Sequence, residues 1–136
     1  MEQTTYAMRT ALTLPFQEVV QRTKEALKKE GFGVLTEIDV KNTLREKLGK
    51  DFRNYVILGA CNPPLAFEAL SKETEIGLML PCNVIIYEEK GNKTVVSAID
   101  PVVALSIVDS PELNKTAQLV AEKLGRVIES LEKGQK

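Results

Sequence analysis

The sequence contains no histidine and no tryptophan, and only two of its 136 residues are cysteines. Without histidine there is no Ser-His-Asp or Cys-His catalytic arrangement, no histidine-ligated metal site and no histidine pH switch. Two cysteines are too few for a disulfide framework, which is typical of a reducing compartment. Any chemistry would therefore use thiols, carboxylates, lysines, tyrosines or backbone groups, and the sequence assigns a catalytic role to no residue.

An excess of charge and long apolar runs are also missing. The chain has 18 basic and 19 acidic residues, a net charge of −1 and no cluster of basic residues. Because a nucleic-acid groove needs clustered positive charge, we expect no nucleic-acid partner. The first residues lack the features of a secretory signal, and every apolar run is shorter than the roughly 20 residues of a membrane span. We therefore expect a cytoplasmic protein without a membrane partner.

Phosphate-binding motifs are absent as well, so we expect no cofactor. What is present is an ordinary globular balance, with 43% hydrophobic and 27% charged residues. A chain of 136 residues without repeats or linkers indicates a single domain, 1–136.

Hydrophobic periodicity and turn residues predict the secondary structure. Alternating or continuous apolar patterns predict five strands, at 5–13, 32–38, 55–60, 83–88 and 94–99. Helical spacing predicts two long helices, one after Pro15 and one from Ser110-Pro111. Short helices are predicted at 40–48, between Asp39 and Gly49, and after Asn62. We therefore expect an α+β fold with a mostly antiparallel five-stranded sheet, two long helices on one face and short connecting helices.

The one concentrated chemical feature is a repeated Cys-Asn pair. Cys61-Asn62 lies where a predicted strand meets a predicted helix, and a thiolate there would be stabilised by the helix start. The alternative is structural: Cys61 is a small buried apolar residue and Asn62 is an N-cap. An N-cap does not exclude ligand contact, since a helix start can also hold an anion.

The second pair, Cys82-Asn83, precedes the fourth predicted strand. If the third and fourth strands pair, Cys61 and Cys82 can face each other and form a reversible disulfide, provided that their Cα atoms lie within about 7 Å. They could also supply half of a soft-metal site, but without histidine two cysteines are a weak zinc signal, and we predict no metal. Asp100, before Pro101, is expected to stabilise a turn, from which it could point into a shared pocket.

Four ordered segments of the chain resemble the domain-of-unknown-function family 302. They are Gly31–Asp39, Tyr55–Pro63, Leu80–Asn83 and Asp100-Pro101. The resemblance implies an α+β fold of the TATA-binding-protein-like type, a β-α-β4-α unit with additions, and no established biochemical activity. It also implies that Asn62-Pro63 and Asp100-Pro101 are the shared elements and that the cysteines are an addition of this branch. It does not imply DNA binding, because fold and function separate.

The leading hypothesis is a module that binds a small polar or anionic ligand in a strand-end pocket. Its predicted lining is Cys61, Asn62, Cys82, Asn83 and Asp100, with N–H groups of the helix start as donors. One alternative is a thiol redox or peroxide-responsive protein that uses Cys61 and Cys82. The other is a structural module that forms a homodimer through a sheet face or edge.

Overall fold

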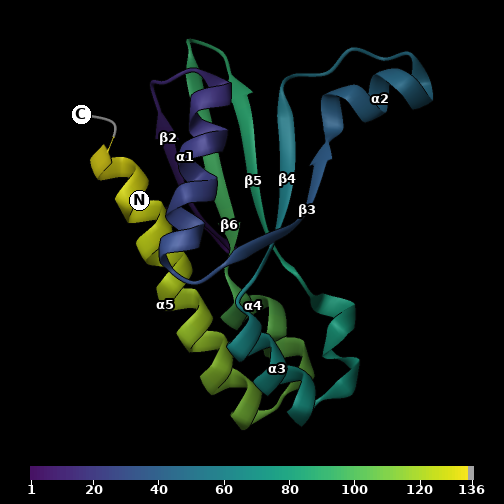
Figure 1. The fold of residues 1–136 in the computed structure, drawn as a ribbon, viewed down its shortest axis with the longest axis vertical. Helices are drawn as coiled ribbons and strands as arrows, with labels where there is room; N and C mark the ends of the chain where they lie inside the picture. Colours follow the sequence, from purple (N-terminus) through teal and green to yellow (C-terminus); the bar gives the residue numbers. More distant parts are fainter. Residues whose placement is uncertain (135–136) are drawn as a thin grey trace.

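A computed structural model describes residues 1–134. The chain forms one six-stranded sheet with the strand order β1-β2-β6-β5-β4-β3, in which every neighbouring pair is antiparallel (Figure 1). The strands are β1 Glu2–Gln3, β2 Ala7–Leu12, β3 Gly33–Asp39, β4 Tyr55–Cys61, β5 Cys82–Glu89 and β6 Lys93–Ile99.

Two long helices lie against one face of this sheet. They are α1, Phe16–Lys29, and α5, Pro111–Gly134, and they also contact each other (Figure 1). Both helices are amphipathic. Every second residue of a strand points to the face that they cover, and the apolar stripes of the helices pack against these side chains. This main core includes Leu12, Val19, Leu27, Leu58, Val84, Ile86, Val96, Leu124 and Ile128.

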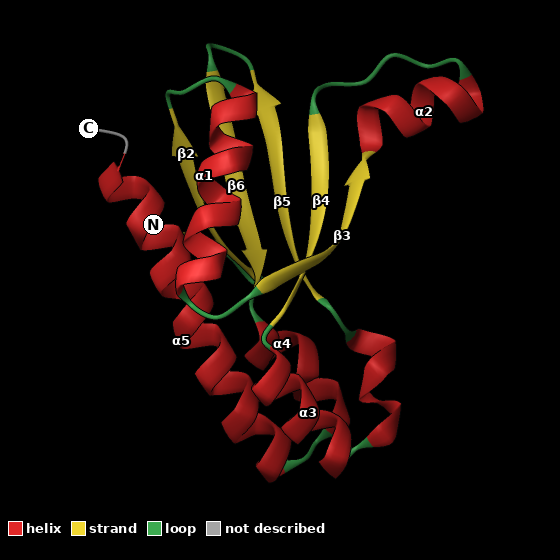
Figure 2. Cartoon of the chain, viewed as in Figure 1, coloured by secondary structure: helices red, strands yellow, loops and turns green. Residues whose placement is uncertain are grey.

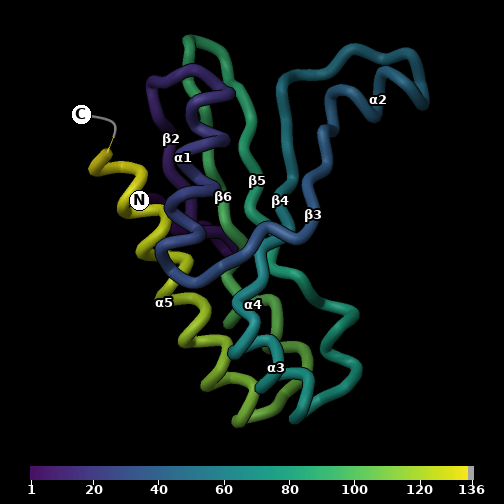
Figure 3. The backbone as a smooth tube through the Cα atoms, in the orientation of Figure 1, coloured from purple at the N-terminus to yellow at the C-terminus, as the bar shows by residue number. Residues whose placement is uncertain are grey.

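The short helices gather at the end of the sheet where β4 and β6 finish and β5 begins. Figure 2 shows these helices in red below the yellow strands. Figure 3 shows the backbone passing from the strands to these helices at the lower end of the sheet. A second, smaller core of Ala69, Ile76 and Leu113 holds this end together. The short helices are α3 Pro63–Lys72, η1 Thr74–Met79, α4 Pro101–Leu105 and η2 Ser106–Val108.

The remaining short helix, α2 (Val40–Leu48), projects away from the body of the molecule (Figure 1). Its predicted bounds are confirmed. Asp39 caps it by accepting from the N–H of Asn42 at 3.0 Å, and Gly49 ends it at φ 64°, a conformation that favours glycine. None of its residues is buried: the helix contacts β3 and β4, Val40 and Leu44 are half-buried, and Leu48 is 65% exposed.

Two details of the predicted fold are wrong. The sheet has six strands instead of five, because Glu2 and Gln3 pair with the outer edge of β2 as β1. Two residues are too short for an alternating pattern to show. The short helices η1, α4 and η2 are also absent from the prediction, although Asp100-Pro101 carries the same cap-and-proline signal as Asn62-Pro63. With the additions set aside, the order β2-α1-β3-β4-β5-β6-α5 is strand, helix, four strands, helix.

Candidate functional site

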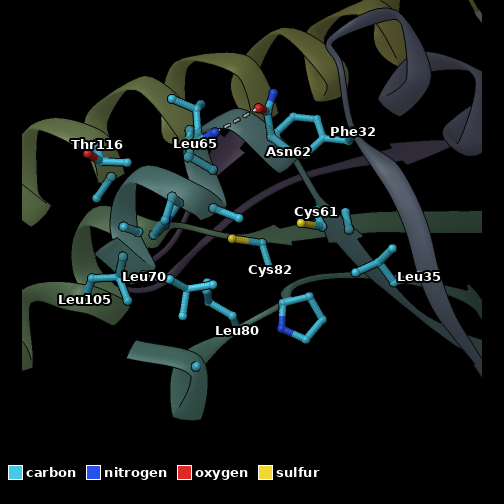
Figure 4. Close-up of a pocket in the computed structure, with 18 residues that line it drawn as sticks. Phe32, Leu35, Cys61, Asn62, Leu65, Leu70, Leu80, Cys82, Leu105 and Thr116 are labelled. Atoms are coloured by element: carbon cyan, nitrogen blue, oxygen red, sulfur yellow. Dashed lines mark hydrogen bonds between the residues drawn. The ribbon is translucent and has the colours of Figure 1, made fainter. Parts of the chain in front are cut away.

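A cavity of about 290 Å³ lies between the two cores, at the ends of β4 and β5 (Figure 4). Its walls come from the sheet, from α3 and α5, and from the segments beside η1 and α4. Residues that line it include Phe32, Leu35, Ala60, Cys61, Asn62, Leu65, Ala66, Ala69, Leu70, Leu80, Cys82, Leu105, Thr116 and Val120. The lining holds three of the five predicted site residues, Cys61, Asn62 and Cys82.

The lining is mostly apolar and carries no charged side chain. Its two hydrogen-bonding side chains already have partners: the Thr116 hydroxyl donates to the Glu68 carboxylate at 3.4 Å, and Asn62 is bonded on both sides of its amide. Throughout residues 1–134, no buried side-chain nitrogen or oxygen lacks a hydrogen-bond partner. The cavity therefore offers a guest apolar contact and no unpaired buried polar group.

Asn62 is the N-cap of α3, as the sequence predicts. Its Oδ1 accepts from the N–H of Leu65 at 3.4 Å, and its backbone carbonyl accepts from the N–H of Ala66 at 2.8 Å. The two residues between are Pro63 and Pro64, which have no N–H group. The first turn of α3 thus keeps no free backbone donor, and the predicted contribution of its N–H groups to anion binding has no chemical basis at this position.

Cys61 and Cys82 are both free thiols, and both point into the cavity (Figure 4). Cys82 is paired with Ala60 across β4 and β5, which places Cys61 one residue beyond its partner. Burial, and secondarily the neighbouring Cys61, raise the pKa of the Cys82 thiol to about 11. Because the thiolate is the reactive form, Cys82 is a poor nucleophile at neutral pH.

Leu35 reaches the cavity because the edge strand is irregular. The register of β3 against β4 shifts between Val34 and Thr36, which leaves Leu35 as the extra residue of a β-bulge. A bulge re-aims a side chain, and Leu35 lies at the rim of the cavity although it is 66% exposed. A strand pattern alone gives no sign of this.

A second cavity of about 340 Å³ adjoins the first. The two share five lining residues, Leu80, Pro81, Cys82, Pro101 and Leu105. Asn83, the fourth predicted site residue, lines this second cavity and is exposed to solvent. The remaining lining of the second cavity is Leu78, Met79, Ile99 and Ala104.

The fifth predicted residue, Asp100, lines neither cavity. Its Oδ1 accepts from the N–H of Val102 at 3.0 Å, which caps α4, and its Oδ2 accepts from the Gln3 amide at 3.2 Å. Asp100 is buried by these contacts and ties β1 to the end of β6. In this structure Asp100 is the N-cap of α4. Its neighbour Pro101 lines both cavities.

Sequence reasoning missed most of the lining, which comes from aliphatic residues of α3, α5 and the η1 segment. A partial signal exists in Leu65, Ala66, Ala69 and Leu70, which give α3 a broad apolar face. Within residues 1–134, no three cysteine or carboxylate side chains come together as a metal site, and no helix has the length and apolar character needed to cross a membrane.

Comparison with known proteins gives the chain a family. No curated protein matches it. The structure is similar to a crystal structure of an uncharacterized conserved protein, DUF302, from Bacillus stearothermophilus, with a TM-score of 0.84 and 31% sequence identity over 90% of this chain and 95% of that chain. The sequence model of the Domain of unknown function DUF302 matches residues 8–131. The chain therefore belongs to the DUF302 family.

Proposed function

We propose that this protein is a binding module for a small, largely apolar molecule, held in the cavity between its two cores. The observation that carries the proposal is a cavity of about 290 Å³ whose lining has no charged side chain. Apolar cavities take up apolar guests, and an enclosed one of about 150 Å³ accepts benzene. By that measure this cavity accommodates a guest of roughly ten non-hydrogen atoms.

The chemical class of the ligand thus differs from the polar or anionic one that the sequence suggested. A buried anion needs a cation or several N–H donors, and moving it out of water without them is costly. Lining residues supply no cation, and the start of α3 has its N–H groups occupied or replaced by Pro63 and Pro64. An apolar guest needs neither.

Titration of the ¹⁵N-labelled protein with n-butylbenzene, which has ten carbons, tests the proposal. We expect saturable amide shifts that centre on Leu65, Ala66 and Val120, which line the cavity. Ala66→Leu fills the cavity and should weaken binding at least tenfold. Ser71→Leu adds a comparable side chain to an exposed position of the same helix and should leave binding unchanged.

Two results would reject this function. One is the absence of saturable shifts in the wild-type protein. The other is equal binding by Ala66→Leu and wild type, because the guest would then lie elsewhere. Folding of both variants is checked by their amide spectra before titration.

The apolar stripe of α2 favours a second candidate, self-association with another copy of the chain. Val40, Leu44 and Leu48 recur along one side of this helix, none of them is buried, and Leu48 is 65% exposed. A second copy could cover the stripe by helix pairing. Light scattering should then give a dimer mass that Leu48→Glu converts to a monomer mass, whereas Lys50→Glu, also exposed, should not. A monomeric wild type at millimolar concentration would exclude this candidate.

A further inference from the structure

We infer that the ligand is an unbranched alkyl chain that runs from the first cavity into the second, with its polar end at the exposed side near Asn83. This inference rests on the proposed binding function and narrows it to one ligand shape. Chains of this kind occur free, as alcohols or carboxylates, and as parts of larger lipids.

The shape follows from how the two cavities adjoin. Their common lining is the segment Leu80–Cys82 together with Pro101 and Leu105, so an aliphatic wall separates one space from the other. Leu80 and Leu105 are only partly buried and pack against the small core, which is separate from the main core. A compact guest can fill one space, whereas a flexible chain that displaces these two side chains fills both.

The volumes set the length of the chain. At the packing of benzene in an apolar cavity of about 150 Å³, the first space holds on the order of ten to twelve carbons. The second adds about 340 Å³, and both spaces are partly open to solvent. A chain that uses both spaces should therefore keep gaining affinity beyond twelve carbons, to roughly sixteen.

The lining also decides what the head group contributes. Charged side chains are absent from both linings, and the second contains one polar side chain, that of Asn83, which is exposed. A carboxylate placed there meets no cation, so it gains nothing over a hydroxyl. Affinity should follow chain length, at roughly fourfold per buried methylene, and be nearly independent of the head group.

The test is a series of n-alkyl alcohols from six to sixteen carbons, each below its solubility limit, titrated into the full chain and followed by the same amide shifts. We expect affinity to rise roughly fourfold per carbon past twelve carbons. Shifts should spread from Ala66 and Val120 to Met79 and Ala104 as the chain lengthens. Decanol and decanoate should bind within about threefold of each other; a clear preference for decanoate would overturn the assignment of the head group.

Two variants distinguish the alkyl-chain ligand inferred here from the proposed binding of a small apolar molecule. Ala104→Phe narrows the second cavity only and should remove the gain beyond twelve carbons while leaving butylbenzene binding unchanged. Val103→Phe, at an exposed position of the same helix that lines neither cavity, should bind like wild type. Butylbenzene binding with a plateau at or before twelve carbons, or with no effect of Ala104→Phe, overturns the inference and leaves the proposed function standing. Loss of butylbenzene binding in the wild type overturns both.

Discussion

The side-chain amide of Asn62 donates to the carbonyl oxygen of Glu30 at 3.4 Å and so joins the end of α1 to the start of α3. The close approach depends on Gly31, which has φ 84° and lies so near that a Cβ there would be 3.0 Å from the Asn62 amide nitrogen. Asn62, which the sequence suggests for ligand contact, therefore links two helices, and both the N–H donor and the oxygen acceptor of its side-chain amide are hydrogen-bonded. Its amide shapes one side of the cavity by holding α3 in place.

Asn62→Ala should therefore destabilise the whole fold. It removes the cap of α3 and leaves the Glu30 carbonyl without this partner, which together should lower the free energy of unfolding by about 1–2 kcal/mol. Urea unfolding followed by circular dichroism measures the change. Asp39→Ala is the control, because it removes the cap of a helix with no buried residue and should affect α2 locally. Equal losses in the two variants would contradict the role of Asn62 as a link between two helices.

The parts of the fold that the sequence predicted are those set by local signals. Asp39 with Gly49, and Asn62 with Pro63, fix helix ends within a few residues, and alternating or continuous apolar patterns located the five longer strands. Strand β1 was not predicted because it forms only by pairing with β2, and its two residues carry no pattern that shows this pairing. The cavity was not predicted for a similar reason: it is a gap between two cores, and its volume depends on how α3 and α5 pack rather than on a motif.

Gly59 is another position where close neighbours leave no room for a side chain, here the side chains of Thr36 and Pro81. A Cβ at Gly59 would lie 2.2 Å from the Thr36 Oγ1 and 2.8 Å from the Pro81 Cγ, distances that real side chains do not tolerate. Gly59→Ala should cost about 1–3 kcal/mol of stability through overpacking. Gly33→Ala is the matched control in the neighbouring strand, since its nearest contact would be 4.0 Å from a backbone oxygen.

A double-mutant cycle locates the cause of that loss. Thr36→Ala removes the nearest atom, and combined with Gly59→Ala it should recover part of the stability, leaving the contact with Pro81. Strictly additive effects in thermal or urea unfolding would show that the Thr36 hydroxyl is not the obstacle.

The thiol of Cys82 should react slowly at neutral pH and faster as the pH rises. Its pKa is raised to about 11, so each pH unit below that value lowers the thiolate fraction, and the rate with iodoacetamide, about tenfold. The measurement uses Cys61→Ala, which leaves Cys82 as the only thiol, although removal of Cys61 also takes away a smaller cause of the shift. A labelling midpoint near 8.5 in that variant would contradict the predicted burial of Cys82.

The same shift makes stability fall at alkaline pH. In the unfolded chain the thiol loses its proton at lower pH than in the folded chain, so the unfolded state binds fewer protons in the range between the two values. Stability contributed by the protonated thiol is complete below the unfolded pKa and is lost as the pH rises toward about 11. The free energy of unfolding of the wild type should therefore decline more between pH 8.5 and 10.5 than that of Cys82→Ala; parallel curves would contradict this linkage.

The pKa of Tyr55 should lie above the ordinary value for a tyrosine side chain. Burial raises its pKa, and the phenol groups of Tyr87 and Tyr6 raise it further by repulsion between the charged forms. Tyr55 and Tyr87 are cross-strand partners whose rings stack at 5.4 Å, so Tyr87→Phe keeps the stack and removes the nearer charge. Absorbance titration near 295 nm should show one phenol above the ordinary range in the wild type, absent in Tyr55→Phe. Tyr87→Phe should lower the pKa of Tyr55 only in part, because burial is the larger cause. A Tyr55 that titrates at its ordinary pKa in the wild type would contradict the raised pKa, and a return to that value in Tyr87→Phe would reverse the order of the two causes.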